Sequence, residues 1–169
     1  ALRNPVHIKP FRPADLALSS PDGSMPVIQV VPGQIVTRES TEVPLRRNGY
    51  ILSDPGRDLL KLVVVERHRA TGNIGRALVK GFGLKRGALA TSMAHDSHNI
   101  VAVGVSDEDI HVAVQAVAGM QGGLAVVEGG KVLASLALPI AGLLSDEPLE
   151  KTAARLEELE RAARELGST

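Results

Sequence analysis

Residues 88–105, ALATSMAHDSHNIVAVGV, contain two apolar runs that flank a short polar segment. Small and β-branched side chains fill the runs 88–94 and 100–105, and such residues are typical of buried strands. The polar segment 95–99 is short enough to be a hairpin loop. The stretch therefore predicts two neighbouring strands of one sheet, with a polar loop at their shared end.

Further strand candidates lie on both sides of this stretch. An apolar run at 59–65 ends in the polar run 66–69 and predicts another buried strand. The runs 124–127 and 132–136 flank a Gly-Gly pair. Because glycine reaches the positive φ angles of tight turns, this pattern predicts a β-hairpin.

Helical signals are fewer than strand signals. The Gly-rich turn 71–75 is expected to start a short helix that runs through Lys80. Ser106 and Asp109 fit the Ser-x-x-acid capping box, and apolar residues at helical spacing follow them. We expect that second helix to end near residue 119.

The C-terminal segment has the clearest helical pattern. Asp146 is expected to cap this helix and Pro148 to lie in its first turn. Charged residues cover the face opposite the apolar stripe, so the pattern predicts a long amphipathic helix. The fold class is therefore α+β, with a mainly antiparallel sheet and about three helices. The apolar stripe consists of Leu149, Ala153, Leu156, Leu159, Ala163 and Leu166.

Composition excludes several classes of protein. The chain of 169 residues carries 19 Lys and Arg against 19 Asp and Glu. It is too short for a (β/α)₈ barrel, which needs about 250 residues. Zero net charge and only three aromatic residues argue against a nucleic-acid partner. With no cysteine there are no disulfides and no thiolate ligands, which is consistent with a cytoplasmic protein.

The composition changes near residue 58. Most of the ten prolines lie in 1–57, which reads as short strands joined by turns, including 27–31 and a partner at 35–37. The strands and helices described above lie in 58–169. No apolar run approaches the ~20 residues of a membrane-spanning helix. The sequence thus predicts a proline-rich β segment, 1–57, and an α+β domain, 58–169.

The polar segment 95–99 is the first candidate site. It could equally be a structural loop whose side chains cap the local backbone. A Ser-His-Asp triad is the least favoured functional reading, because consecutive residues of an extended segment point to opposite faces. His95 and His98 could bind a metal with Asp96 or His68 as third ligand, or the loop could form a polar rim that hydrogen-bonds a ligand.

The polar run after the strand 59–65 is the second candidate site. Arg67 and His68 precede the Gly-rich turn that contains Asn73, and such a turn could hold an anion or a ring. No Walker or dinucleotide-binding pattern is present, so a purely structural turn is favoured here.

Six motifs occur in an order that resembles a known family. They are VERH (65–68), TGNIG (71–75), KGFGL (80–84), GA (87–88), AHDSHN (94–99) and LPIAGL with SD (138–146). This set closely resembles the C-terminal region of bacterial adenine deaminases, members of the amidohydrolase superfamily. The dense part of the resemblance runs from about residue 58 to 147, and segment 1–57 is similar to the chain that leads out of the barrel in that family.

The resemblance implies hydrolysis of adenine to hypoxanthine and ammonia. In the family a metal centre of manganese or iron, held in a (β/α)₈ barrel, activates the attacking water. The barrel ligands precede this region, and no run here matches them, so we expect no metal ligand and no cofactor in this chain. We therefore expect a chain that is inactive alone, and its start at Ala1 suggests a cut or processed end.

The resemblance implies that the polar segments support catalysis close to the substrate, which the barrel holds. Their individual roles are hypotheses from hydrogen-bond chemistry. Imidazoles of the 95–99 loop could contact the purine edge, and the Asp96 carboxylate could orient one of them. The catalytic candidates are His95, Asp96 and His98, and the substrate-binding candidates are Arg67, His68, Asn73, Ser97 and Asn99.

Two alternatives remain open at this point. The chain could be a stand-alone purine-binding or subunit-contact module without activity. It could also be a small hydrolase with a metal held by His68, His95 and His98. The expected partners are adenine and an amidohydrolase barrel, in the same chain or a separate one, with a second copy as a further partner. We expect neither nucleic acid nor membrane as a partner.

Overall fold

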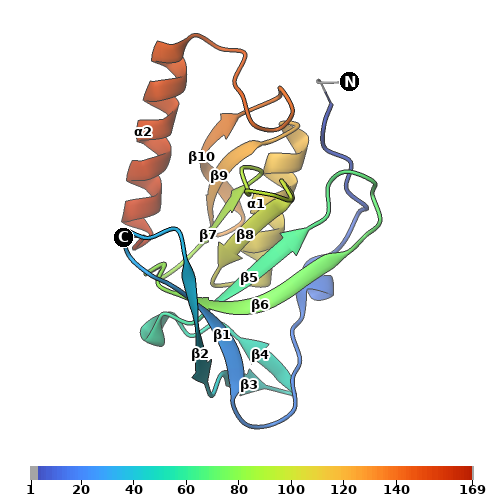
Figure 1. Cartoon of the computed structure of the whole chain (residues 1–169), viewed down its shortest axis with the longest axis vertical. Coiled ribbons are helices and arrows are strands. Elements are labelled where there is room, and N and C mark those ends of the chain that lie inside the picture. The colour runs from blue at the N-terminus through green and yellow to red at the C-terminus, as the bar shows by residue number, and fades with distance from the viewer. Residues whose placement is uncertain (1–3, 169) are drawn as a thin grey trace.

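The computed structural model of the chain describes residues 4–168 and contains one large sheet between two α-helices (Figure 1). No helix in this part of the chain combines the length and apolar character needed to cross a bilayer. The main sheet contains β1 (Met25–Val30), β2 (Thr37–Glu42), β5 (Leu60–Val65), β6 (Ile74–Lys80), β7 (Ala88–Thr91), β8 (Ile100–Gly104), β9 (Gly123–Glu128) and β10 (Lys131–Ala137). The other elements are the β3 (Leu45–Arg47) and β4 (Tyr50–Leu52) pair, the 3₁₀ turns η1 (Pro13–Leu16) and η2 (Pro55–Arg57), α1 (Asp107–Gly119) and α2 (Leu149–Glu165).

The predicted strand pair is present at the centre of the sheet. β7 and β8 are antiparallel, from the Ala88–Gly104 pair to the Thr91–Val101 pair. The strand order is β10-β9-β7-β8-β5-β6-β1-β2, and the only parallel neighbours in the described sheet are β1 and β6. The α+β class and the mainly antiparallel sheet are thus confirmed.

The prediction of three helices was wrong, because the segment expected to be a short helix through Lys80 forms strand β6. β6 pairs with β5 along most of its length, and its last two residues, Val79 and Lys80, also pair with β1. Leu78 and Val79 point to opposite faces and are both buried. Gly75 also weakens a helix, so long-range strand pairing outweighs the local signal. The described residues contain two α-helices.

Helix α1 covers one face of the sheet. The Ser106 hydroxyl accepts a hydrogen bond from the Asp109 N–H at 3.2 Å, as the predicted N-cap requires. The Asp109 carboxylate does not complete the capping box. It accepts instead from the N–H groups of Gly129 and Gly130, at 3.2 and 2.7 Å, in the predicted Gly-Gly hairpin. One carboxylate thus joins α1 to the β9–β10 turn.

Helix α2 lies on the opposite face, against β9 and β10 (Figure 1). Its N-cap is Pro148 without a side-chain hydrogen bond, so the expected cap at Asp146 was wrong. Only the C-terminal half of the predicted stripe is buried: Leu159 and Leu166 are in the core, whereas Leu149 is 78% exposed. Between α2 and the sheet remains an apolar groove of about 280 Å³.

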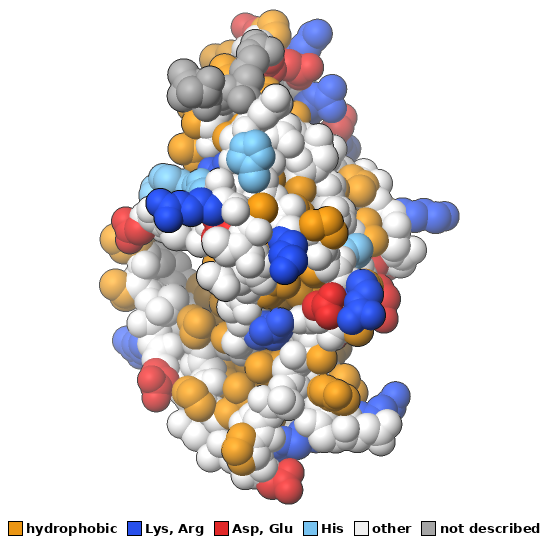
Figure 2. Space-filling model, turned by 90° about the vertical axis from the view of Figure 1, so that its right-hand side faces the viewer, with side chains coloured by type: hydrophobic (Ala, Val, Ile, Leu, Met, Phe, Trp, Pro, Cys, Tyr) orange, Lys and Arg blue, Asp and Glu red, His pale blue; other side chains and the backbone are white. Residues whose placement is uncertain are grey.

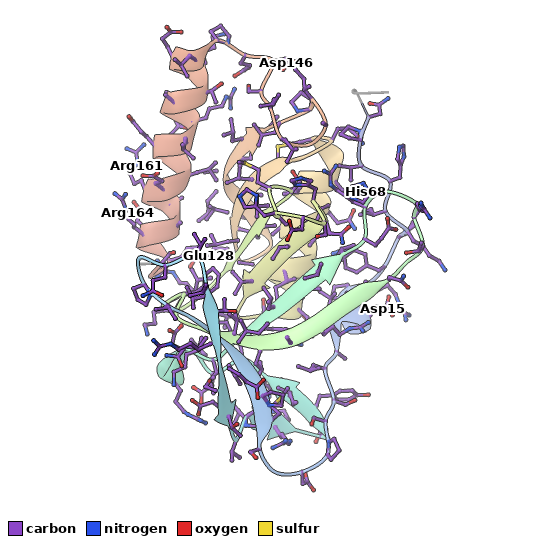
Figure 3. The ribbon with its side chains drawn as sticks, in the orientation of Figure 1. Asp15, His68, Glu128, Asp146, Arg161 and Arg164 are labelled. Atoms are coloured by element: carbon purple, nitrogen blue, oxygen red, sulfur yellow. The ribbon has the colours of Figure 1, made fainter. Side chains whose placement is uncertain are left out.

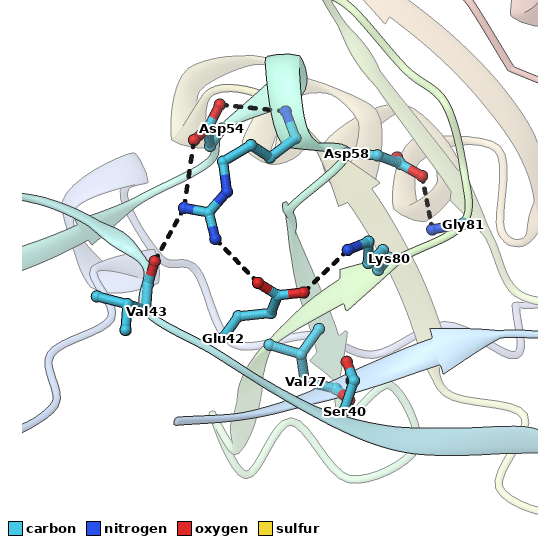
Figure 4. Close-up of polar contacts among 9 residues, drawn as sticks. Val27, Ser40, Glu42, Val43, Asp54, Asp58, Lys80 and Gly81 are labelled. Atoms are coloured by element: carbon cyan, nitrogen blue, oxygen red, sulfur yellow. Dashed lines mark hydrogen bonds and ion pairs between the residues drawn. The ribbon is translucent and has the colours of Figure 1, made fainter. Parts of the chain in front are cut away.

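The N-terminal segment joins the same sheet through β1 and β2. β1 has an antiparallel partner as predicted, but that partner, β2, runs from Thr37 to Glu42, so only Thr37 of the predicted segment 35–37 lies in it. Glu42 accepts from Arg57 and Lys80, both at 2.9 Å, which ties β2 to η2 and β6 (Figure 4). Asp58 accepts from Gly81 N at 2.8 Å. The sheet continues across the boundary proposed at residue 58, and the division into two domains stays a prediction.

Replacing Ile110 with alanine tests the core beneath α1. Ile110 is 0% exposed, so Ile110→Ala should lower the free energy of unfolding by about 2–5 kcal/mol in urea denaturation. The matched control is Ile35→Ala, because Ile35 is 104% exposed and should change stability by less than about 0.5 kcal/mol. Equal effects of the two substitutions would contradict this description of the core.

Candidate functional site

The polar candidates gather at one end of the main sheet. Loop 66–73 follows β5, and turn 95–99 lies in the connection from β7 to β8. Because Val65 at the end of β5 pairs with Ile100 at the start of β8, both segments lie at the same end of the strands. His68 Nε2 lies 2.9 Å from the Ser97 carbonyl oxygen, which joins loop and turn directly. His68 lies well away from α2 (Figure 3). Histidine side chains are also visible at the surface on the side of the molecule that carries this loop (Figure 2).

Glu66 organises the first of these loops. Its carboxylate accepts from the main-chain N–H groups of His68, Arg69 and Thr71, at 2.5, 2.7 and 2.9 Å, and from the Thr71 hydroxyl at 2.9 Å. The Thr71 N–H, together with the other donors, lowers the pKa of Glu66 to about 2. The loop therefore closes around an ionised carboxylate.

The turn 95–99 is closed by its own backbone. His98 N donates to Ala94 O at 2.7 Å, and Ser97 N donates to His95 O at 3.0 Å. Asp96 and His98 have φ angles of 69° and 47°, in the left-handed region. The turn exposes the side chains of His95 and Asp96 to solvent. This geometry presents an imidazole and a carboxylate at the surface.

The inner residues of this turn are half-buried. His98 Nδ1 and Asn99 Oδ1 are buried and have no hydrogen-bond partner among the described residues. Asn99 also lines a surface hollow together with Glu66, Asn73 and Val64. The structure thus brings Asn73 and Asn99 to one hollow, and it leaves hydrogen-bonding capacity unused beside it.

The Ser97 hydroxyl has a local partner. Its oxygen accepts from Asn99 N at 3.4 Å, and no hydrogen bond to an imidazole is found for it in the described residues. This contact is the local backbone capping that is expected if the segment is a structural loop. The arrangement gives no support to a Ser-His-Asp triad.

Arg67 does not have the position expected of a substrate-binding residue. Its side chain is 1% exposed, and burial lowers the pKa of its guanidinium. The guanidinium donates to carbonyl oxygens of Pro5, at 3.1 Å, Ala141, at 3.0 Å, and His98. We therefore correct the prediction for Arg67: it is enclosed by main-chain atoms and has no surface for a ligand.

The residues expected to ligate a metal in the small-hydrolase alternative do not form such a site. No three His, Asp or Glu side chains in the described part of the chain are grouped in a way that could hold a metal ion. His68 meets the turn only through the main chain of Ser97. A metal held by His68, His95 and His98 does not fit this geometry.

Sequence reasoning missed Ser92 and Gly142. Ser92 is fully buried, donates to Gly142 O at 2.6 Å and accepts from Gly123 N at 2.8 Å. Gly142 lies between Ser92 and the Arg67 guanidinium. The available signals were a serine that ends an apolar strand and a glycine within the LPIAGL motif.

The low pKa of Glu66 predicts how loop 66–73 responds to acid. A carboxyl group whose folded pKa is about 2 stabilises the loop above its ordinary pKa of 4.5. That contribution is lost as the pH falls from 4.5 through 2. NMR titration should place the midpoint of the Glu66 carboxyl near 2, with the Thr71 amide shift following it. Glu66→Gln should abolish this titration, and a midpoint near 4.5 would contradict the geometry.

The comparisons with known proteins agree on one family. The family model for the adenine deaminase C-terminal domain matches residues 34–169. An adenine deaminase of Dehalococcoides mccartyi is 53% identical over 168 residues, which is 99% of this chain and 29% of that protein. The adenine deaminase of Desulfatibacillum aliphaticivorans is 53% identical over 154 residues, 91% of this chain and 27% of that protein.

More distant relatives have the same coverage. An adenine deaminase of Bacillus pumilus is 45% identical over 168 residues, which is 99% of this chain and 29% of that protein. The chain therefore spans less than a third of the length of these relatives. Because the family model covers most of the chain, the chain belongs to the adenine deaminase C-terminal domain family.

Proposed function

We propose that this chain is the C-terminal part of an enzyme that hydrolyses adenine to hypoxanthine and ammonia. The observation that carries the proposal is 53% identity to an adenine deaminase over 99% of the chain. The chain matches 29% of that relative, so the catalytic barrel belongs to the rest of such an enzyme. In this proposal the chain alone is inactive.

Within that enzyme, turn 95–99 meets the substrate. His95 and Asp96 are exposed on a turn held at the end of the sheet, so they can reach a second domain without rearrangement of the fold. The purine edge has both acceptors and donors, and a neutral imidazole offers one of each. We assign His95 and His98 to hydrogen bonds with the purine or the leaving ammonia, and Asp96 to orienting an imidazole.

Asn73 and Asn99 line the neighbouring hollow, and the His68 ring lies against the Ser97 carbonyl oxygen. Amide side chains donate and accept at once, which suits recognition of a heterocycle. The unpaired Oδ1 of Asn99 and Nδ1 of His98 support this assignment, because buried polar atoms normally have partners. Ser97 contributes its carbonyl oxygen to His68 and in this way fixes the His68 ring.

The metal centre belongs to the barrel in this proposal. The described residues of this chain do not fit a metal ion, since no three potential ligands are grouped. Manganese or iron in the barrel would supply hydroxide from bound water near neutral pH. This chain contributes only groups that bind or orient.

The proposed partners are therefore adenine and an amidohydrolase barrel, and the proposed location is the cytoplasm. The absence of cysteine supports a reducing compartment. Self-association of the chain stays a prediction, which sedimentation at micromolar concentration would test.

Alanine substitutions in a full-length enzyme that contains this chain test the proposal. His95→Ala and Asp96→Ala should each lower kcat/KM for adenine by about tenfold or more, because a hydrogen bond to a reacting group is lost. Ammonia release measures the rate. The control is Asp22→Ala, since the Asp22 side chain is exposed and lies outside the site. Circular dichroism verifies that every variant folds.

The same assay separates the proposal from its alternatives. Unchanged turnover in both site variants would show that the turn does not meet the substrate. Adenine binding to the isolated chain, measured by calorimetry, together with an inactive full-length protein would favour the stand-alone binding module.

A further inference from the structure

We propose that Arg67 is the positioning residue of the candidate site: its buried guanidinium holds turn 95–99 and segment 138–144 in the conformations that the site requires. The structural part of this proposal concerns the chain alone. Its consequence for turnover rests on the proposed function. Arg67 itself touches no substrate, because it is 1% exposed.

The guanidinium joins three segments that are far apart in the sequence. Nε donates to His98 O, Nη1 to Pro5 O at 3.1 Å and Nη2 to Ala141 O at 3.0 Å. These acceptors lie 31, 62 and 74 residues from Arg67. Among the described residues, no carboxylate forms an ion pair with Arg67. Main-chain oxygens therefore provide the stabilisation of this buried charge.

Two of these acceptors are strained residues. His98 has a φ of 47° and Ala141 a φ of 58°, although neither is glycine. A non-glycine residue in the left-handed region is sterically disfavoured and persists only where surrounding contacts hold it. Both residues offer their carbonyl oxygen to the same guanidinium. The hydrogen bonds to Arg67 thus compensate strain at both points.

The far side of the guanidinium is closed by Gly142. A Cβ placed on Gly142 would lie 2.6 Å from Arg67 Nη1, so any side chain there would displace the guanidinium. Ser92 holds Gly142 from the opposite side, with 2.6 Å between its hydroxyl and Gly142 O. Arg67 is therefore confined between turn 95–99 and segment 138–144.

A lysine at position 67 could not form the three hydrogen bonds of the Arg67 guanidinium. The guanidinium donates in three directions from a rigid plane, whereas an ammonium group is a compact charge on a flexible stem. Arg67→Lys keeps the charge but leaves carbonyl oxygens without donors. The side chains of His95, Asp96 and His98 then lose the fixed backbone from which they project.

Hydrogen exchange of the isolated chain tests the structural part. The reporter is the His98 amide, which donates to Ala94 O inside the turn. Arg67→Lys should accelerate its exchange by about tenfold or more, with little change at amides of β5 and β8. The matched control is Arg76→Lys: the exposed Arg76 also donates to main-chain oxygens, those of Asp15 and Ile74, away from the turn. It should leave the His98 amide unchanged.

A second variant keeps Arg67 and moves its guanidinium. Gly142→Ala should accelerate exchange at the His98 amide as Arg67→Lys does, because the new Cβ displaces Nη1 of Arg67. Gly33→Ala is its control, since Gly33 has a similar φ, +71° against +74°, and open space around it. If neither Arg67→Lys nor Gly142→Ala accelerates exchange at His98, or if all amides accelerate equally, the proposal is wrong.

Turnover by a full-length enzyme that contains this chain tests the consequence. Arg67→Lys should lower kcat for adenine at least about fivefold with a smaller change in KM, since the turn is displaced but not removed. A loosened turn with unchanged kcat and KM would leave the structural role of Arg67 intact and overturn the proposal that turn 95–99 meets the substrate. A fall in kcat with an ordered turn would overturn the positioning role.

Discussion

The buried guanidinium of Arg67 constrains this end of the molecule more than any other group. A charge removed from water needs hydrogen-bond partners, and here they are carbonyl oxygens of Pro5, His98 and Ala141. Three segments must therefore converge on one point, although each is a loop or an extended stretch with little core of its own. The pairing of β5 with β8 brings turn 95–99 beside loop 66–73, and the hydrogen bonds of Arg67 hold them together there.

The sheet provides the fixed frame for this convergence. Arg67 follows β5, which lies between β8 and β6 near the middle of the strand order. α1 and α2 cover opposite faces, so side chains from both sides bury the central strands. The site loops leave the ends of these strands, where a rigid scaffold meets solvent. The polar side chains of turn 95–99 are therefore exposed to solvent and still held in fixed positions by the sheet.

The sequence correctly predicted those elements that are determined by residues close together in the chain. The apolar runs of residues 88–105, the Gly-Gly hairpin and the Ser106 cap needed only neighbouring residues, and all are confirmed. β6 was missed because its strand conformation depends on pairing with β5 and β1, and the residues of β6 alone do not indicate that pairing. The site shows the same division: the polar cluster was recognisable, but the burial of Arg67 depends on acceptors up to 74 residues away.

A second buried cation shows why carbonyl oxygens suit the site better than a carboxylate would. Lys61, near the start of β5, is also buried, and it pairs with Asp107 at 2.5 Å. That pair joins one side chain to another and fixes β5 against the start of α1. Arg67 has to hold the main chain of loops, whose own residues are short or strained. A bidentate carboxylate would take two of the five N–H donors of the guanidinium and leave fewer for those carbonyl oxygens. Because main-chain oxygens of three segments accept instead, one side chain joins all three.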